Sequence, residues 1–184
     1  MPNHSLQARR PFRAVALAQT LDREALTMSI DSRSDNAGVI APAPIIYGAA
    51  IAVGLAAEFA LPIALLPQPV GLWLGAVTIA ISIPIVVSAF RALARAHTAF
   101  DARKPTNRIV TDGAFRYSRN PTYLSLTLLH VGVALVLSSL WVLLMVVPAV
   151  AAIHWGVVLR EERYLEVKFG EEYRSYAAKV RRWV

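Results

Sequence analysis

The feature that most constrains this chain is a run of forty residues without a charged side chain, from Asn120 to Leu159. As a single helix the run would be about 60 Å long, whereas the core of a bilayer is about 30 Å thick. The run must therefore fold back on itself, and Ser138-Ser139 near its middle predicts the turn. We expect two membrane spans here, about 121–137 and 140–159.

A second apolar region lies upstream, because residues 36–90 contain no Lys or Arg and a single acid, Glu58. This region is long enough for two further spans, about 45–66 and 70–90, joined by an uncharged link at 67–69. The sequence therefore predicts an all-α fold, a polytopic membrane helix bundle with about four transmembrane helices. Glu58 is either a functional acid within the membrane or a hydrogen-bonded packing residue.

The nineteen Lys and Arg residues fall into three clusters, five in 9–33, seven in 91–119 and seven in 160–182. Basic residues concentrate in cytoplasmic loops, so we expect all three clusters and both termini on the cytoplasmic side. A multi-pass protein of a bacterial inner membrane fits this arrangement. The formal net charge of +7 then reflects loops that face anionic lipid, and we expect no nucleic-acid partner.

The same pattern divides the chain into a tail and a membrane domain. Residues 1–43 are mixed in charge, which predicts a partly disordered cytoplasmic tail with a short helix near 15–26. Met28 is a hypothetical alternative start of translation. In the membrane domain, 44–184, the last part (160–184) places apolar residues at helical spacing opposite charged ones. This predicts an amphipathic helical segment at the cytoplasmic interface, broken at Gly170.

Polar residues gather at 111–123, TDGAFRYSRNPTY, where the basic loop 91–120 meets the third span. Asn120 as N-cap and Pro121 at the first helical position predict a helix start. Its free amides and positive dipole end, with Arg119 just before them, favour an anion. Gly113 permits a tight bend or a close approach to a ligand. The alternative is that the arginines only anchor the span at lipid headgroups.

The pair Glu161-Glu162 lies at the cytoplasmic end of the fourth span. Two adjacent carboxylates are costly at a membrane edge unless they have partners. The candidate partners are Arg116, Arg119 and Arg160, or a cationic ligand. A solvated helix end with local ion pairs is the alternative interpretation.

Several common catalytic motifs are absent from the sequence. It contains no Gly-rich phosphate loop, serine nucleophile elbow, zinc motif or Rossmann fingerprint. His130 and His154 have no second ligand at metal-binding spacing, so we interpret both as packing residues and expect no metal site. Hydrolysis and nucleotide-driven transport are therefore unsupported.

Three blocks of sequence together resemble the isoprenylcysteine carboxyl methyltransferase and phospholipid methyltransferase family. They are IVTDGAFRYSRNPTYLS (109–125), EERYLEVKFGEEYRSY (161–176) and VRRW (180–183). Enzymes of this family are integral membrane proteins that use S-adenosylmethionine without a Rossmann domain. The resemblance covers about residues 70–184, and its specificity lies in the order and spacing of the three blocks.

The resemblance implies that the cofactor is bound by the loop before the third span and by the first acid of the pair. The implied contacts are Asn107, Arg108, Ile109, Val110, Phe115, Asn120, Pro121, Thr122, Tyr123 and Glu161. Gly113, at the predicted bend, completes this set. The segment 160–184 is then expected to cover the site as a lid, through Phe169, Tyr173 and Tyr176.

Methyl transfer from a sulfonium is a direct displacement, so such an enzyme mainly aligns the reacting atoms. Glu161 would neutralise the cofactor's positive charge, and Arg119 with the helix start would hold its carboxylate. An amine acceptor must also lose a proton, which Tyr123 or Glu162 would take. Arg119, Tyr123 and Glu162 are therefore the predicted catalytic residues.

Two departures from the family bear on the acceptor. Phe115 stands where the eukaryotic carboxyl methyltransferases have Tyr, and Val157 where they have an Arg linked to the carboxylate of the prenyl substrate. The second departure argues against prenylcysteine and leaves methyl transfer intact. We expect an amphipathic or lipid-borne acceptor bearing a carboxylate, amine or thiol. The alternatives are a non-catalytic scaffold that keeps the cytoplasmic module, and a reductase of hydrophobic ring substrates.

Overall fold

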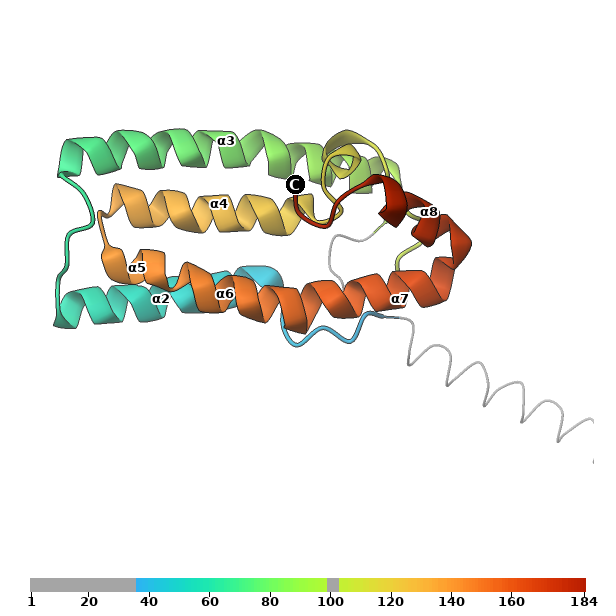
Figure 1. Cartoon of the computed structure of the whole chain (residues 1–184), viewed down its shortest axis with the longest axis horizontal. Helices are drawn as coiled ribbons and strands as arrows, with labels where there is room; N and C mark the ends of the chain where they lie inside the picture. The colour runs from blue at the N-terminus through green and yellow to red at the C-terminus, as the bar shows by residue number, and fades with distance from the viewer. Residues whose placement is uncertain (1–35, 99–102) are drawn as a thin grey trace, which may run out of the picture. The chain divides into compact units, whose positions relative to one another are not determined.

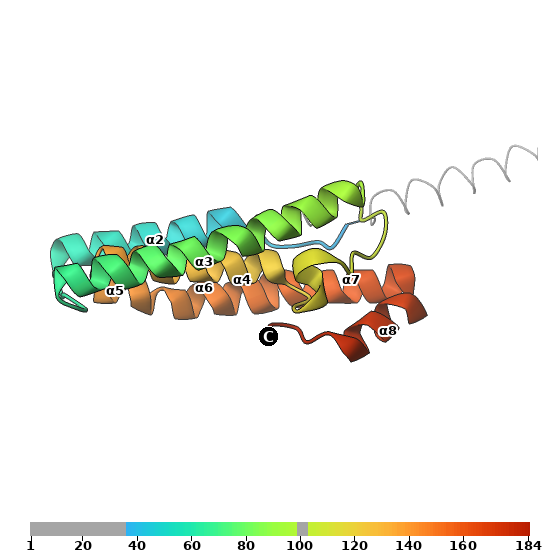
Figure 2. The same ribbon diagram turned by 90° about the horizontal axis from the view of Figure 1, so that it is seen from above.

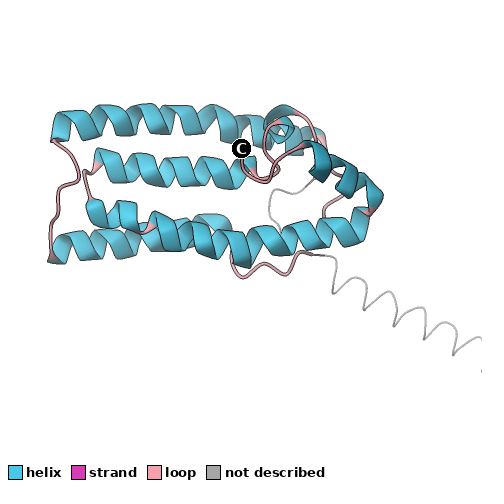
Figure 3. Ribbon diagram, viewed as in Figure 1, coloured by secondary structure: helices cyan, strands magenta, loops and turns pink. Residues whose placement is uncertain are grey.

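The computed structural model describes residues 36–98 and 103–184, and every structural statement below concerns these residues. The tail helix expected near 15–26 and the hypothesis about Met28 lie outside them. Within them, all regular structure is helical apart from one isolated β-bridge (Figure 3). Three helical stretches are long and apolar enough to cross a bilayer, and a fourth is apolar but shorter. The prediction of a helical membrane bundle is confirmed.

Four helical stretches build the bundle (Figures 1 and 2). The first three are α2 (Ala43–Ala60), α3 (Gln68–Arg95) and α4 (Pro121–Val136). The fourth comprises α5 (Leu140–Leu144), α6 (Val146–Ile153), the π-helical turn η2 (His154–Val158) and α7 (Leu159–Phe169). The short 3-10 helix η1 (Gly113–Arg116) and α8 (Glu171–Lys179) lie at one end of the bundle. Helix α3 packs along α4, and α2 packs along α5 and α6.

Glycines bring α3 and α4 into backbone contact. A Cβ atom at Gly75 would lie 2.6 Å from the carbonyl oxygen of Gly132 and 2.6 Å from the amide nitrogen of Val136. A Cβ atom at Gly71 would lie 2.6 Å from the carbonyl oxygen of Leu135. No side chain fits at such distances, so only glycine permits this approach. Close backbone packing of this kind is a main source of helix association in lipid, where apolar burial gives little advantage.

The first span ends earlier than predicted, at Ala60 rather than 66. The cause is Pro62, whose ring disfavours the helical conformation at Leu61, and Leu61 has φ −146°. The chain after Leu61 then runs beside the turn at Ser138-Ser139. Ala64 forms an antiparallel bridge with Ser139, and the Leu65 amide donates to the Ser138 carbonyl at 2.8 Å.

The second span is longer than predicted, because α3 continues from 90 to Arg95. The added residues, RALAR, are strong helix formers, so nothing in the sequence stops the helix at the membrane edge. The third span, by contrast, matches its predicted bounds within one residue.

The turn predicted at Ser138-Ser139 is confirmed, since α4 ends at Val136 and α5 begins at Leu140. The Ser139 hydroxyl accepts a hydrogen bond from the Val142 amide as an N-cap and donates one to Glu58 at 2.6 Å. Buried His130 bonds to the Val142 carbonyl at 3.0 Å. These contacts give Glu58 and His130 the packing roles that the sequence allowed.

Beyond Leu159, the predicted end of the fourth span, the helix continues through α7 to Phe169. It breaks at Gly170, with φ +54°, as predicted, and α8 turns back from there. The π-helical turn η2 inserts an extra residue before α7 and so rotates α7 about its axis. Segment 36–42 crosses this turn, where the Ile40 amide donates to the Gly156 carbonyl at 3.2 Å. Arg160 also donates to the Gly38 carbonyl at 2.8 Å.

Replacement of Gly75 by Ala should destabilise the bundle, because the added methyl group meets backbone atoms that cannot move aside. Overpacking of this kind typically costs about 1–3 kcal/mol. The measurement is the melting temperature in detergent. Gly48→Ala is the matched control, since no atom lies within 4 Å of a Cβ there. Equal melting temperatures for the two variants would show that the α3–α4 contact does not hold the bundle together.

Candidate functional site

A cavity of about 80 Å³ lies where the segment 103–120 meets α4, α7 and α8. It is lined by Leu93, Thr98, Thr106, Arg108, Ile109, Val110, Phe115, Arg119, Asn120, Pro121, Thr122, Tyr123, Glu161, Glu162, Leu165, Tyr173 and Tyr176. Eleven of the thirteen predicted site residues are among them, so residues as far apart in the sequence as Arg108 and Glu162 converge on one space.

The start of α4 forms one wall of the cavity. Helix α4 begins at Pro121 as predicted, but the expected N-cap bond of Asn120 is wrong, because its side chain accepts nothing from the helix. Instead the Asn120 Nδ2 group donates to the carbonyl of Arg182 at 3.0 Å. The Asn120 side chain is therefore bonded to a residue near the C-terminus and not to the helix. The first turn of α4 therefore has no side-chain cap where it faces the cavity.

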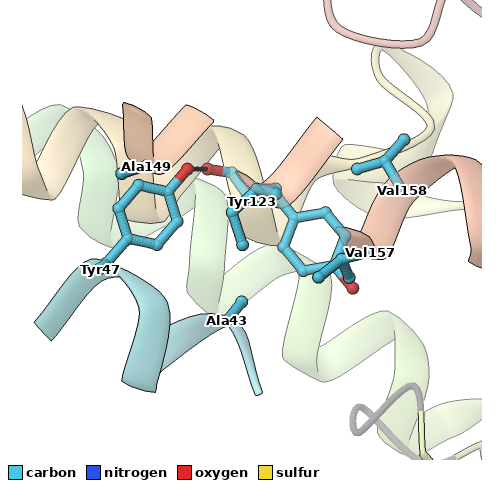
Figure 4. Close-up of a cluster of buried hydrophobic side chains, with 7 residues drawn as sticks. Ala43, Tyr47, Tyr123, Ala149, Val157 and Val158 are labelled. Atoms are coloured by element: carbon cyan, nitrogen blue, oxygen red, sulfur yellow. Dashed lines mark hydrogen bonds between the residues drawn. The ribbon is translucent and has the colours of Figure 1, made fainter. Parts of the chain in front are cut away.

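Tyr123 and Glu161 form a hydrogen-bonded pair on the next wall. The Tyr123 hydroxyl donates to Glu161 Oε2 at 2.8 Å. The Tyr123 ring is held in a buried cluster with Tyr47, Val157 and Val158, and the Tyr47 hydroxyl donates to the Tyr123 carbonyl at 3.4 Å (Figure 4). The packed ring fixes the position of its hydroxyl, so Glu161 is held by a phenol rather than by the expected arginines.

Glu162 is held by two guanidinium groups. Arg182 donates to both of its carboxylate oxygens, at 2.8 and 3.0 Å, and Arg119 lies at 3.5 Å. Of the three candidate partners, Arg119 is therefore correct. Arg160 is not, since it bonds to Gly38, and Arg116 is exposed. Arg182 is not among the predicted partners, although it lies in the VRRW block.

Two predicted residues do not line the cavity. The side chain of Asn107 is bonded to the chain just after α3, because its Nδ2 group donates to the His97 carbonyl at 2.6 Å. Gly113 adopts φ +58°, which agrees with the predicted bend, but it faces α3. A Cβ there would lie 3.0 Å from the Ser88 hydroxyl, so Gly113 allows η1 to approach α3. Both residues shape the loop rather than face the cavity.

Helix α8 contributes two tyrosines to the lining of the cavity. The Tyr176 hydroxyl donates to the Phe115 carbonyl at 2.8 Å, and Arg119 donates to the Tyr173 hydroxyl at 3.4 Å. Phe169, expected beside them, is absent from the lining because it precedes the bend at Gly170. Burial, with the nearby charge of Glu162, raises the pKa of Tyr173 to about 12. Burial also raises the pKa of Tyr176.

A model of the phospholipid methyltransferase family matches residues 70–172, more than half of the chain. The chain belongs to this family. The resemblance seen in the sequence is thus confirmed, and family membership implies a membrane methyltransferase. The matched region includes the loop and both glutamates, but not Tyr173, Tyr176 or Arg182.

One curated relative is also similar to this chain. It is an uncharacterised protein of Haemophilus influenzae (strain ATCC 51907 / DSM 11121 / KW20 / Rd), 45% identical over 62 residues. That stretch covers 34% of this chain and 98% of the relative. No solved structure matches the chain. Among the described residues, no group of three His, Cys, Asp or Glu side chains is arranged to hold a metal.

The raised pKa of Tyr173 predicts how stability depends on pH. The unfolded phenol ionises near pH 10, so the folded state binds the proton more tightly between about pH 10 and 12. Stability from this group is present below pH 10 and is lost as the pH rises towards 12. The melting temperature should fall over this window, and less steeply in Tyr173→Phe. Tyr117 is exposed, so Tyr117→Phe is the control, and its melting temperature should fall as steeply as that of the parent. An equally steep fall in Tyr173→Phe would contradict the burial of Tyr173.

Proposed function

We propose that this protein transfers a methyl group from S-adenosylmethionine to an amphipathic or lipid-borne acceptor at the cytoplasmic face of the membrane. Family membership supports methyl transfer. The observation that carries the proposal is the convergence on one cavity of eleven of the thirteen site residues that the sequence predicts. The cavity joins a buried carboxylate, an arginine and an uncapped helix start, which are the groups that a zwitterionic sulfonium cofactor needs.

The residues present fit such a cofactor. Among the described residues, Glu161 has a phenol as its hydrogen-bond partner and no ion-pair partner, so a cationic ligand would neutralise its charge. Arg119 Nε is buried without a partner in the described part of the chain. Arg119 and the start of α4 would therefore hold the cofactor's carboxylate. The apolar side formed by Leu93, Val110 and Phe115 would take the nucleoside.

The protein's own part in the reaction is to bind, align and exclude water. S-Adenosylmethionine supplies an electrophilic methyl group whose transfer needs no covalent enzyme intermediate. Tyr173 and Tyr176 cover the cavity from α8, which keeps water away from the reacting charges. An amine acceptor would pass its proton to the Tyr123–Glu161 pair. Glu162, engaged by two guanidinium groups, serves better to position Arg119 than to accept a proton.

The acceptor would reach the cavity from the bilayer, because the cavity lies at the end of the membrane bundle. Two earlier alternatives become outcomes of one experiment, titration of the detergent-purified protein with S-adenosylmethionine and with NADPH. Binding of NADPH alone would indicate the reductase. Binding of S-adenosylmethionine without transfer of labelled methyl groups to any component of a membrane extract would indicate the scaffold.

Glu161→Gln should weaken binding of S-adenosylmethionine by about ten- to a hundredfold, because a charge-assisted hydrogen bond contributes about 1.5–3 kcal/mol. The melting temperature without ligand should change little, since the glutamine oxygen can still accept from Tyr123. Calorimetry measures the affinity. Glu171→Gln is the matched control, as this exposed carboxylate lies outside the cavity. Unchanged affinity in Glu161→Gln would contradict the site, and no binding by the parent would contradict the function.

The proposed orientation predicts that the loop 103–120 faces the cytoplasm and that the link before α3 faces the other side. The chain contains no cysteine, so single cysteines at exposed Lys104 and Gln68 report on the two ends. An impermeant thiol reagent applied to intact cells should label Gln68→Cys and leave Lys104→Cys unlabelled until the cells are opened. The reverse pattern would overturn the orientation.

A further inference from the structure

Residues 180–184 form a strap that crosses the site from α8. The Arg119 amide donates to the Arg181 carbonyl at 2.9 Å, and the carbonyl of Arg182 accepts from Ser118 at 3.3 Å and from Asn120 at 3.0 Å. Trp183 packs against the buried cluster that holds Tyr123, with its ring 6.2 Å from that of His154. The strap is therefore fixed at several points to the loop and to the fourth helical stretch.

Arg182 joins two walls of the cavity. Its carbonyl holds the residues just before α4, while its guanidinium holds Glu162 on α7. The side chain of Glu162 is only 14% exposed, and so is that of Arg119. Planar, two-pronged contact between guanidinium and carboxylate is strong and geometrically specific under such burial.

Arg119, Glu162 and Tyr173 stand between the cavity and a second hollow. This hollow, of about 390 Å³, lies between α7 and α8 and is also lined by Arg182. Glu162 is thus paired with Arg119, which lines both spaces, and with Arg182, which lines the hollow and not the cavity. The nearer contacts are those of Arg182, at 2.8 Å against 3.5 Å for Arg119.

We propose that Arg182 is a positioning residue, which satisfies Glu162 so that Arg119 stays available to an anion in the cavity. Without Arg182, the buried carboxylate of Glu162 would be left with Arg119 as its cation, and direct pairing would draw Arg119 away from the cavity. The role of Arg182 in cofactor binding rests on the proposed function. Its role in ordering the residues just before α4 does not.

The test compares S-adenosylmethionine affinity across four variants of the full chain in detergent. Arg182→Ala should weaken binding by about tenfold or more, and Arg182→Lys should restore part of it, since a lysine offers charge without the planar fork. The double variant Arg182→Ala with Glu162→Gln also lacks the competing carboxylate. It should bind S-adenosylmethionine more tightly than Arg182→Ala alone. Arg181→Ala is the matched control: its exposed side chain lines neither hollow, and affinity should equal that of the parent.

A purely structural role would give a different result, because the double variant would then bind S-adenosylmethionine no more tightly than Arg182→Ala alone. That outcome, or parent affinity in Arg182→Ala, would overturn the proposal. Hydrogen exchange of the peptide 118–124 separates this failure from failure of the proposed function, since it needs no cofactor. Exchange should be faster in Arg182→Ala than in Arg181→Ala even if the parent binds no S-adenosylmethionine, and equal rates would overturn the ordering role.

Discussion

The core of a bilayer offers no water to backbone amides and carbonyls, so each must be paired within the protein. The turn at Ser138-Ser139 shows how this chain meets that constraint where a helix cannot continue. The extended segment after α2 pairs its backbone with both serines, and Ser139 also caps α5 and holds Glu58. Glu58, Ser138 and Ser139 at this end of the bundle are thus engaged in structural hydrogen bonds.

At the opposite end some polar groups lack such partners within the described residues. The first turn of α4 has no side-chain cap, Arg119 has a buried unpaired nitrogen within the described residues, and Glu161 has a phenol for a partner. The difference arises because the strap pairs with Asn120 and Glu162 and leaves their neighbours on the cavity side. Hydrogen bonds close the bundle at the Ser138-Ser139 turn. At the other end they hold the residues that line the cavity.

Much of this could be predicted from residues close together in the sequence. The charge-free run and the apolar region upstream of it predicted four helical stretches, and Gly113 and Pro121 predicted a bend and a helix start where the structure has them. Family resemblance selected the loop and the glutamates. The prediction failed where partners come from distant residues. The Asn120 side chain donates to the Arg182 carbonyl instead of capping α4, and Glu162 pairs with Arg182 rather than with Arg116 or Arg160.

The sequence by itself therefore determined that this chain is a helical membrane bundle, because hydropathy and charge act locally along each helix. Its family followed from the resemblance of three sequence blocks. Only the tertiary structure decided which face of α7 meets the cavity. The π-helical turn at 154–158 changes the phase of that helix by an extra residue, and the strap then secures Glu162 from a second side. Helical phase and long-range pairing depend on packing between distant segments, and no pattern in a single sequence specifies them.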